Sequence, residues 1–125
     1  MKGLLVWSEA PASYQFTDYA VREFVAEWME ILKQNYNHPC IITWTPFNES
    51  WGINRVETER RQQHFTEAIY HLTKSIDPYR PLITNDGWEH TCSDIITLHD
   101  YDQGYDSLKK KYLRFKEEIM DTSVY

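Results

Sequence analysis

Four short segments rich in apolar residues constrain the fold of this chain more than any other feature. They occupy residues 3–7, 40–44, 82–86 and 95–99. The first two do not alternate with polar residues, which is typical of strands covered on both faces. Helical patterns separate the first segment from the second and the second from the third. Because such connections are right-handed crossovers between parallel strands, the order predicts an α/β fold with a parallel sheet.

Amphipathic patterns predict the helices. Apolar residues recur at intervals of three and four over residues 17–35 and again over about 56–75, with Asn54 as a candidate N-cap of the second helix. A last helix is marked by Leu108, Tyr112, Phe115 and Ile119. Only residues 87–94 separate the third and fourth strands, fewer than the roughly 10 to 12 of an ordinary crossover, so a hairpin at this joint stays open.

Charge and composition argue against several classes of binding partner. The chain has 19 acidic residues against 13 Lys and Arg, a net charge of −6, which argues against a nucleic-acid partner. No run approaches the roughly 18 apolar residues of a membrane span, so no membrane partner is expected. The spacing of His90, Cys92 and His99 matches no ligand pattern, and neither a metal nor a cofactor is expected. We interpret residues 1–125 as one domain. The compartment is unknown, with the cytoplasm slightly favoured because no targeting segment is seen.

Polar and aromatic residues gather where the predicted strands end. They are Trp7 and Glu9, Asn48 and Glu49, Asn85, Asp86 and Trp88, and His99, Asp100 and Tyr101. The carboxyl ends of parallel strands form one rim, so these residues are expected to converge on one crevice. Carboxylates and amides pair with hydroxyl groups, and aromatic faces stack on sugar rings. This content favours a carbohydrate over a nucleotide.

These residues resemble the catalytic barrel of glycoside hydrolase family 2, the β-galactosidase and β-glucuronidase family. Four segments carry the resemblance, in that family's order: 3–11, 37–52, 77–89 and 94–101. The most specific part is the strand that ends in Asn48-Glu49 after an Asn-His-Pro-x-Ile-x-x-Trp motif. The resemblance implies a partial (β/α)₈ TIM barrel. The four parallel strands with flanking helices would be strands three to six, about half of a barrel of roughly 250 residues.

The resemblance also implies a retaining β-glycosidase, with β-galactosidase favoured, that acts on carbohydrate β-glycosides by double displacement. Glu49 would be the general acid and base, and Asn48 would bind the substrate's 2-hydroxyl group. Tyr101 resembles the tyrosine that orients the nucleophile. The other predicted substrate-binding residues would line the sugar pocket: Trp7, Glu9, Asp86, Trp88 and His99.

This chemistry needs a second carboxyl group about 5 Å from Glu49. In the family it is a Glu at the end of barrel strand seven, which the resemblance does not cover, so we expect the isolated chain to be inactive. Glu49 must stay protonated near neutral pH to act as an acid. Trp44, Phe47 and Trp51 are the candidates for an apolar wall that would raise its pKa, together with the charge of the second carboxylate.

Two other hypotheses stay open. One is a non-catalytic carbohydrate-binding or interaction module on a barrel-derived scaffold. The other is an independent α/β domain of flavodoxin-like form with a fully covered sheet. Under the half-barrel interpretation, strands three and six have unpaired edges and the apolar layer of the barrel lies open. That interpretation predicts self-association of the chain through these edges.

Overall fold

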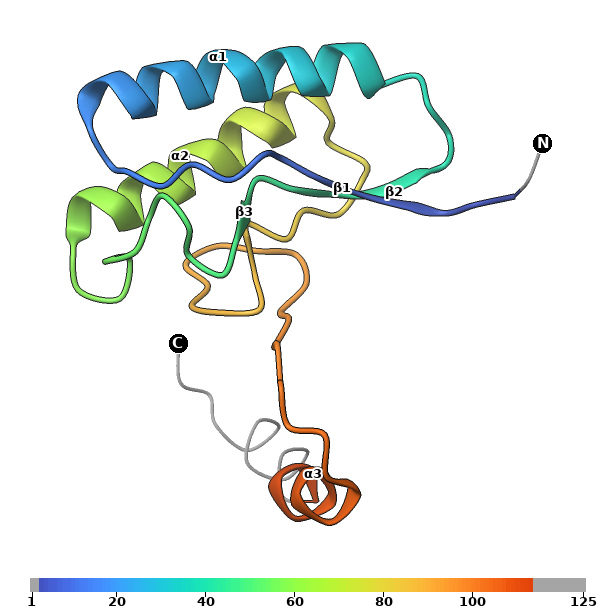
Figure 1. The fold of residues 1–125 in the computed structure, drawn as a ribbon. Coiled ribbons are helices and arrows are strands. Elements are labelled where there is room, and N and C mark those ends of the chain that lie inside the picture. The colour runs from blue at the N-terminus through green and yellow to red at the C-terminus, as the bar shows by residue number, and fades with distance from the viewer. Residues whose placement is uncertain (1–2, 114–125) are drawn as a thin grey trace.

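Two long helices pack together over one face of short parallel strands in the computed structural model, which describes residues 3–113 (Figure 1). The strands are β1 (Val6–Glu9), β2 (Ile41–Thr45), β3 (Phe47–Asn48) and β4 (Asn85–Asp86). The helices are α1 (Asp18–Asn35), α2 (Arg60–Ile76) and α3 (Tyr105–Tyr112). The alternation of strands and helices confirms an α/β chain.

The strands pair in parallel. β1 lies along β2, and Glu9 is opposite Thr45. β3, which follows β2 after the single residue Pro46, lies along β4, and Asn48 is opposite Asp86. Residues 41–48 (β2 and β3) therefore lie between β1 on one side and β4 on the other, and we call them the central strand. This is the order expected for the first three predicted strands.

The prediction of a fourth strand is not confirmed, because no strand is assigned at residues 95–99. Two backbone hydrogen bonds nevertheless tie this region to the preceding strand. The Asp94 amide donates to the Leu82 carbonyl at 2.8 Å, and the His99 amide donates to the Gly87 carbonyl at 3.2 Å. Both bonds join residues twelve apart, so the two segments run in the same direction and the joint is not a hairpin.

Side chains replace the rest of the backbone ladder there. The Thr84 amide donates to Ser93 Oγ, and the Gly87 amide donates to Thr97 Oγ1, each at 2.9 Å. The Thr97 amide donates to His90 Nε2 at 3.2 Å. Donors that a regular ladder would pair with carbonyl oxygens are thus satisfied by hydroxyl and imidazole groups. Alternation of residue types along the sequence does not reveal this exchange.

Helix α1 matches its predicted bounds. Thr17 caps it, and its side chain accepts a hydrogen bond from the Ala20 amide at 3.1 Å. Its buried face consists of Phe24, Trp28 and Leu32.

The second helix begins later than expected, at Arg60 rather than about residue 56, and Glu59 rather than Asn54 is its N-cap. Consecutive turns fill the gap, with amide-to-carbonyl bonds from Ile53 to Ser50 and from Val56 to Ile53. Ile53 and Val56 are buried in the core, so packing holds these turns in place of a helical turn. Of the markers of the last helix, Phe115 and Ile119 lie outside the described residues.

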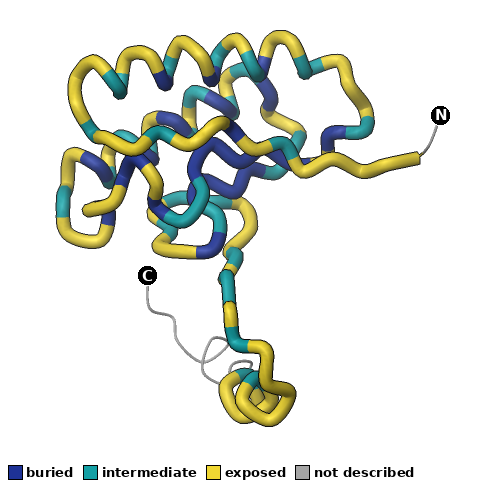
Figure 2. Tube along the Cα trace, viewed as in Figure 1, coloured by how far each residue is buried: buried dark blue, intermediate teal, exposed yellow. Residues whose placement is uncertain are grey.

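Aromatic packing joins the helices to the central strand. The rings of Trp28 and Trp44 meet edge to face at 6.2 Å, and those of Phe24 and Phe47 stack at 4.6 Å. The indole of Trp28 also donates a buried hydrogen bond to Thr73 of α2 at 2.8 Å. Figure 2 shows burial concentrated where α1 and α2 face the strands, whereas the N-terminal part of β1 is exposed and α3 has no buried residue.

Helix α3 stands apart from α1 and α2, at the end of an extended segment (Figure 1). Asp100 ties that segment to the helix through Lys111 Nζ at 2.8 Å and the Tyr112 hydroxyl at 2.5 Å. None of the helices between residues 3 and 113 combines the length and apolarity that a bilayer crossing requires.

Candidate active site

The central strand carries Glu49 to the rim where the parallel segments end. The Glu49 amide donates to the Asp86 carbonyl at 2.8 Å, which joins the end of β3 to the end of β4. His99 and Tyr101 reach the same place from the segment beyond residue 95. Glu9 at the end of β1 interacts electrostatically with Asp86, His99 and Glu49. We call Glu9, Glu49, Asp86, His99 and Tyr101 the Glu49 cluster.

The Glu49 carboxylate is held by two donors. His99 Nδ1 lies 2.7 Å from Glu49 Oε1, and the Tyr101 hydroxyl donates to the same oxygen. On the other side of its ring, His99 Nε2 lies 3.5 Å from Asp86 Oδ2. The imidazole therefore stands between two carboxylates. The side chains of Glu49 and Asp86 are 19% and 13% exposed, so the pair is partly withdrawn from water but still reachable.

These contacts set the protonation of the cluster. Hydrogen bonds from Tyr101 and then His99 lower the pKa of Glu49 below its ordinary value. The bond to Glu49 raises the pKa of His99, and it also raises the pKa of Tyr101. Burial and then the charge of Asp86 raise the pKa of Glu9. In this structure Glu49 is thus an ionised carboxylate facing an imidazole that favours the protonated form.

The pKa of Glu49 is not raised as the expected apolar wall would require, because the hydrogen bonds from Tyr101 and His99 lower it by more than burial raises it. Trp44 is fully buried and its indole donates to Asp77 at 2.9 Å. Phe47 stacks on Phe24 in the core. Trp51 is 48% exposed and meets the ring of Tyr14 at 5.4 Å. The polar donors on Glu49 therefore decide its charge.

The remaining predicted residues surround the cluster more loosely. Asn48 Oδ1 is buried and is an acceptor with no hydrogen-bond partner among the described residues. Trp88 is 38% exposed and its ring centroid lies 6.3 Å from that of His99. Trp7 on β1 is 45% exposed, and no ring contact or hydrogen bond ties its indole to the cluster within residues 3–113. The exposed indole faces suit stacking on a sugar ring.

The local backbone at the rim was not anticipated. Glu49 and Ser50 have φ angles of 49° and 59°, the left-handed region that non-glycine residues rarely adopt. Ser50 is hydrogen-bonded to the buried side chain of Asn85 and to Glu89. A positive φ at Glu49 and Ser50 has no signal in residue type. Asn85 stands among the polar strand ends in the sequence, but its contact with Ser50 depends on the register of β3 and β4.

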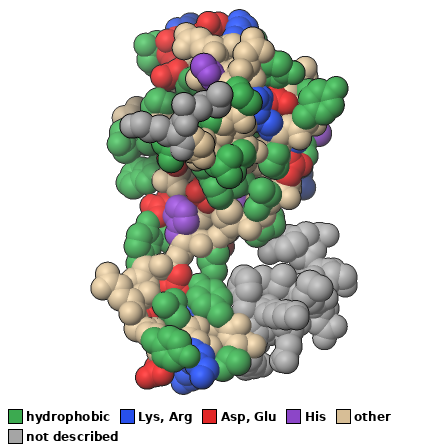
Figure 3. All heavy atoms as spheres, turned by 90° about the vertical axis from the view of Figure 1, so that its right-hand side faces the viewer, with side chains coloured by type: hydrophobic (Ala, Val, Ile, Leu, Met, Phe, Trp, Pro, Cys, Tyr) green, Lys and Arg blue, Asp and Glu red, His purple; other side chains and the backbone are tan. Residues whose placement is uncertain are grey.

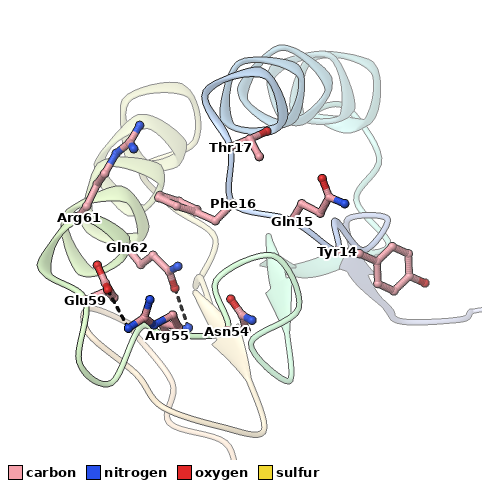
Figure 4. Close-up of a pocket in the computed structure, with 9 residues that line it drawn as sticks. All are labelled: Tyr14, Gln15, Phe16, Thr17, Asn54, Arg55, Glu59, Arg61 and Gln62. Atoms are coloured by element: carbon pink, nitrogen blue, oxygen red, sulfur yellow. Dashed lines mark hydrogen bonds and ion pairs between the residues drawn. The ribbon is translucent and has the colours of Figure 1, made fainter.

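A separate hollow of about 430 Å³ lies between the chain before α1 and the start of α2 (Figure 4). Its lining is Tyr14, Gln15, Phe16, Thr17, Asn54, Arg55, Glu59, Arg61 and Gln62. Several of its polar groups already pair with each other, such as Arg55 with Glu59 at 3.1 Å. The hollow shares no residue with the Glu49 cluster.

The cluster can exchange protons. It combines carboxylates, an imidazole and a phenol, three types of group that serve as general acids and bases. Residues 3–113 contain no group of three or more His, Cys, Asp and Glu placed to hold a metal ion. The residue types of the Glu49 cluster are suited to proton transfer to or from a bound ligand.

Comparisons with known proteins point to one family. The sequence model of the TIM barrel domain of glycosyl hydrolases family 2 matches residues 8–122. A β-glucuronidase of Bacteroides fragilis is 32% identical over 127 residues, which covers 90% of this chain and 17% of that protein. A β-galactosidase of Klebsiella pneumoniae is 38% identical over 74 residues, covering 58% of this chain and 6% of that protein. The chain thus spans less than a fifth of the length of these relatives.

A solved structure shares the fold. The β-glucuronidase of Parabacteroides merdae superposes with a TM-score of 0.72 and 20% sequence identity, over 93% of this chain and 16% of that chain. At this identity the likeness concerns the fold alone. It agrees with a chain that forms part of a barrel.

Proposed function

The chain belongs to glycosyl hydrolases family 2, as part of its TIM barrel domain, and from this premise we propose that it carries the acid/base side of a retaining β-glycosidase active site. The observation that carries the proposal is the position of Glu49. Its carboxylate lies at the carboxyl end of the central parallel strand and contacts both His99 and Tyr101. Catalytic residues of TIM-barrel enzymes come from this end of the strands.

The cluster suits a group that gives and then takes a proton. In a retaining mechanism the acid first protonates the leaving oxygen and later removes a proton from water. The ionised Glu49 is ready for the second task. For the first task, one proton has to move from His99 Nδ1 to Glu49 Oε1, across 2.7 Å. A negative nucleophile nearby would favour that transfer because it raises the pKa of Glu49.

The substrate class that we propose is a β-glycoside of a neutral or acidic hexose. Asn48 offers an unpaired buried acceptor to a sugar hydroxyl, and Trp7 and Trp88 offer exposed ring faces. The resemblance in sequence favours galactose. The B. fragilis β-glucuronidase matches a larger share of the chain than the K. pneumoniae β-galactosidase, so a glucuronide is the second candidate.

We also propose that the 125 residues alone do not turn over substrate, because the resemblance assigns the nucleophilic carboxylate to barrel strand seven, which lies outside the four segments that it covers. The test is hydrolysis of nitrophenyl β-galactoside and β-glucuronide by the isolated chain, where no activity is expected. Turnover that disappears in Glu49→Gln would overturn the inactivity and place both carboxyl groups within this chain.

The acid/base role is tested in a chimera. The segment of the B. fragilis β-glucuronidase that aligns with this chain is replaced by it, and hydrolysis of aryl β-glucuronides is measured. For a poor leaving group, Glu49→Gln is expected to lower kcat by roughly 10² to 10⁴. For an acidic leaving group the loss should be smaller, because departure then needs less protonation.

Glu57→Gln is the matched control for this chimera. Glu57 is exposed and lies in the turns that follow the same rim. Its substitution is expected to leave kcat within about twofold, as for a surface position without a catalytic contact. Equal rates for Glu49→Gln and the unsubstituted chimera with both leaving groups would refute the role of Glu49.

A non-catalytic sugar-binding module is the second candidate, and the exposed indoles together with Asn48 favour it. Calorimetric titration of the isolated chain with galactose and with glucuronate separates the two. Millimolar or tighter binding that is unchanged in Glu49→Gln, together with an inactive chimera, would establish the module instead of the enzyme.

The last part of the proposal concerns association. β1 pairs only with β2 among the described residues, so its other edge keeps unpaired backbone groups. Leu4 and Leu5 beside it are 71% and 72% exposed. Figure 3 views the molecule from the side on which this N-terminal segment projects, and hydrophobic side chains are spread over that face. We propose that a second copy of the chain covers this edge.

A further inference from the structure

The turn that carries Glu49 is conformationally costly. Glu49 and Ser50 both have positive φ, 49° and 59°, and both carry a side chain. In this region the Cβ atom crowds the backbone, so such residues persist only where surrounding contacts hold them. Glycine, which would adopt the conformation freely, is absent from both positions. Something in the neighbouring structure must therefore compensate.

The compensation comes from Asn85 on β4. Its side chain is almost fully buried, at 1% exposed. Asn85 Oδ1 accepts a hydrogen bond from the Ser50 amide at 2.9 Å. Its Nδ2 donates to Ser50 Oγ at 2.9 Å and to the Glu89 carbonyl at 2.7 Å. Ser50 Oγ in turn donates to Glu89 Oε2 at 2.9 Å, so the donors and acceptors of the amide are satisfied together.

The same strand holds the partner of the acid. The carbonyl of Asp86 accepts the Glu49 amide at 2.8 Å, and its carboxylate lies 3.5 Å from the far nitrogen of His99. Asp86 of β4 therefore contacts both the backbone of Glu49 and the imidazole that meets its carboxylate. A change in how β4 grips the turn would move the carboxylate relative to His99.

We propose that Asn85 is a positioning residue: its side-chain amide, through Ser50 and Glu89, holds the left-handed turn that directs the Glu49 carboxylate to His99 and Tyr101. An amide is required because the site needs one acceptor and two donors. Aspartate offers no donor, and it would place a second negative charge beside Glu89. The proposal deepens the proposed function, but its geometric content does not depend on glycosidase activity.

The test uses NMR titration of the labelled 125-residue chain. The charged groups that face His99 are Glu49, Asp86 and Glu9. If the turn loosens, Glu49 withdraws, and the pKa of His99 should fall toward its ordinary value of 6.5. We expect this shift in Asn85→Ala and Asn85→Asp, with the Tyr101 signals changing as well.

Two further variants keep the test decisive. Ser50→Ala removes only the hydroxyl contacts and should produce a smaller shift in the same direction, which serves where Asn85→Ala does not fold. Thr73→Val removes the buried bond to Trp28 far from the rim, so it costs stability but should leave the titration of His99 unchanged. An unchanged His99 titration in folded Asn85→Asp and Ser50→Ala overturns the proposal.

The chimera separates this proposal from the proposed function. If Glu49 is catalytic, Asn85→Asp should lower kcat roughly ten- to hundredfold with little change in KM, since misplacement by about 1 Å has that effect. An inactive chimera together with the expected shift in His99 would reject the glycosidase function and keep the positioning role. An active chimera together with an unshifted pKa of His99 would keep the glycosidase function and reject the positioning role of Asn85.

Discussion

The contact between His99 and Glu49 makes the stability of the candidate site depend on pH. The interaction between the two side chains is strongest when His99 is protonated and Glu49 is ionised, because each stabilises the charged form of the other. The stabilising effect of the lowered Glu49 pKa is complete above its ordinary value of 4.5. The effect of the raised His99 pKa is complete below its ordinary value of 6.5. Their joint contribution is therefore largest between these two values.

The first prediction follows from that window. As pH rises through the raised pKa of His99, the stabilisation by the pair is lost, and it is also lost as pH falls through the lowered pKa of Glu49. His99→Gln should thus lower the urea midpoint more at about pH 5.5 than at about pH 9. His38→Gln, at an exposed position outside the cluster, is the control. Equal losses at both pH values in His99→Gln would contradict the ion pair.

Gly87 is required by the packing of the same imidazole. Its φ is 86°, and a Cβ at this position would lie 2.3 Å from the ring of His99. We predict that Gly87→Ala destabilises the chain by more than about 1 kcal/mol, because both the backbone and the ring must move. Gly104→Ala, where the nearest atom would be 3.4 Å away and φ is −87°, should cost less than Gly87→Ala, because it loses only the preference of a helix N-cap for glycine over alanine. Denaturant unfolding compares them, and similar losses at the two sites would argue against a close approach of His99.

The site could be predicted from sequence in part, and the limit is physical. Glu49, Asp86 and His99 could be predicted as neighbours because each lies at the end of a predicted strand, and the ends of parallel strands converge at one rim. Whether their contacts raise or lower a pKa depends on which donors reach the carboxylate, and Tyr101 reaches it from a segment without regular structure. The grip of Asn85 on Ser50 depends on strand register, which residue types alone do not specify.

At the scale of elements, Asp77 joins α2 to the central strand. Its side chain is 2% exposed and pairs with Arg80 at 2.6 Å. The indole of Trp44 donates to it at 2.9 Å. Burial by itself would raise the pKa of Asp77, but the bonds from Trp44 and Arg80 outweigh it and the pKa is lowered. The carboxylate is thus ionised and fully paired where helix, loop and strand meet.

We predict that Asp77→Ala costs about 3 kcal/mol or more in the free energy of unfolding, because it leaves a buried indole and a guanidinium without their partner. Asp77→Asn should cost less, since an amide oxygen can still accept the indole. Glu30→Gln, which breaks an exposed pair with Lys33, should cost less than about 0.5 kcal/mol. Urea unfolding monitored by tryptophan fluorescence measures all three. A loss in Asp77→Ala no larger than in Glu30→Gln would show that the contacts of Asp77 do not support the junction.

Elements differed in how well the sequence revealed them, for local reasons. Helix α1 has both a capping Thr17 and an apolar stripe, so pattern and cap agree on its bounds. Residues 95–99 have the composition of a strand, but hydroxyl and imidazole groups take the ladder bonds. The predicted start of α2 was too early because Val56, which was counted as part of the apolar face of the helix, is buried in the core from a turn that precedes it.

At the scale of the whole molecule, the helices cover one side of the strands and leave β1 incompletely protected. Val6 and Trp7 are 37% and 45% exposed, and Ile42 on the neighbouring strand is 42% exposed. In a closed barrel such residues have a layer of side chains against them. An exposed strand edge beside apolar side chains favours pairing with another chain.

The last prediction is that this surface makes the chain a dimer or larger at tens of micromolar. Leu5→Lys places a charge on the edge at a residue that is 72% exposed, so it should shift light scattering toward the monomer mass without unfolding the core. Tyr79→Lys is the matched control, because Tyr79 is 87% exposed but lies in the loop after α2. It should leave the mass unchanged. A monomer at these concentrations in the unsubstituted chain would refute association, and a shift caused equally by Tyr79→Lys would place the contact elsewhere than β1.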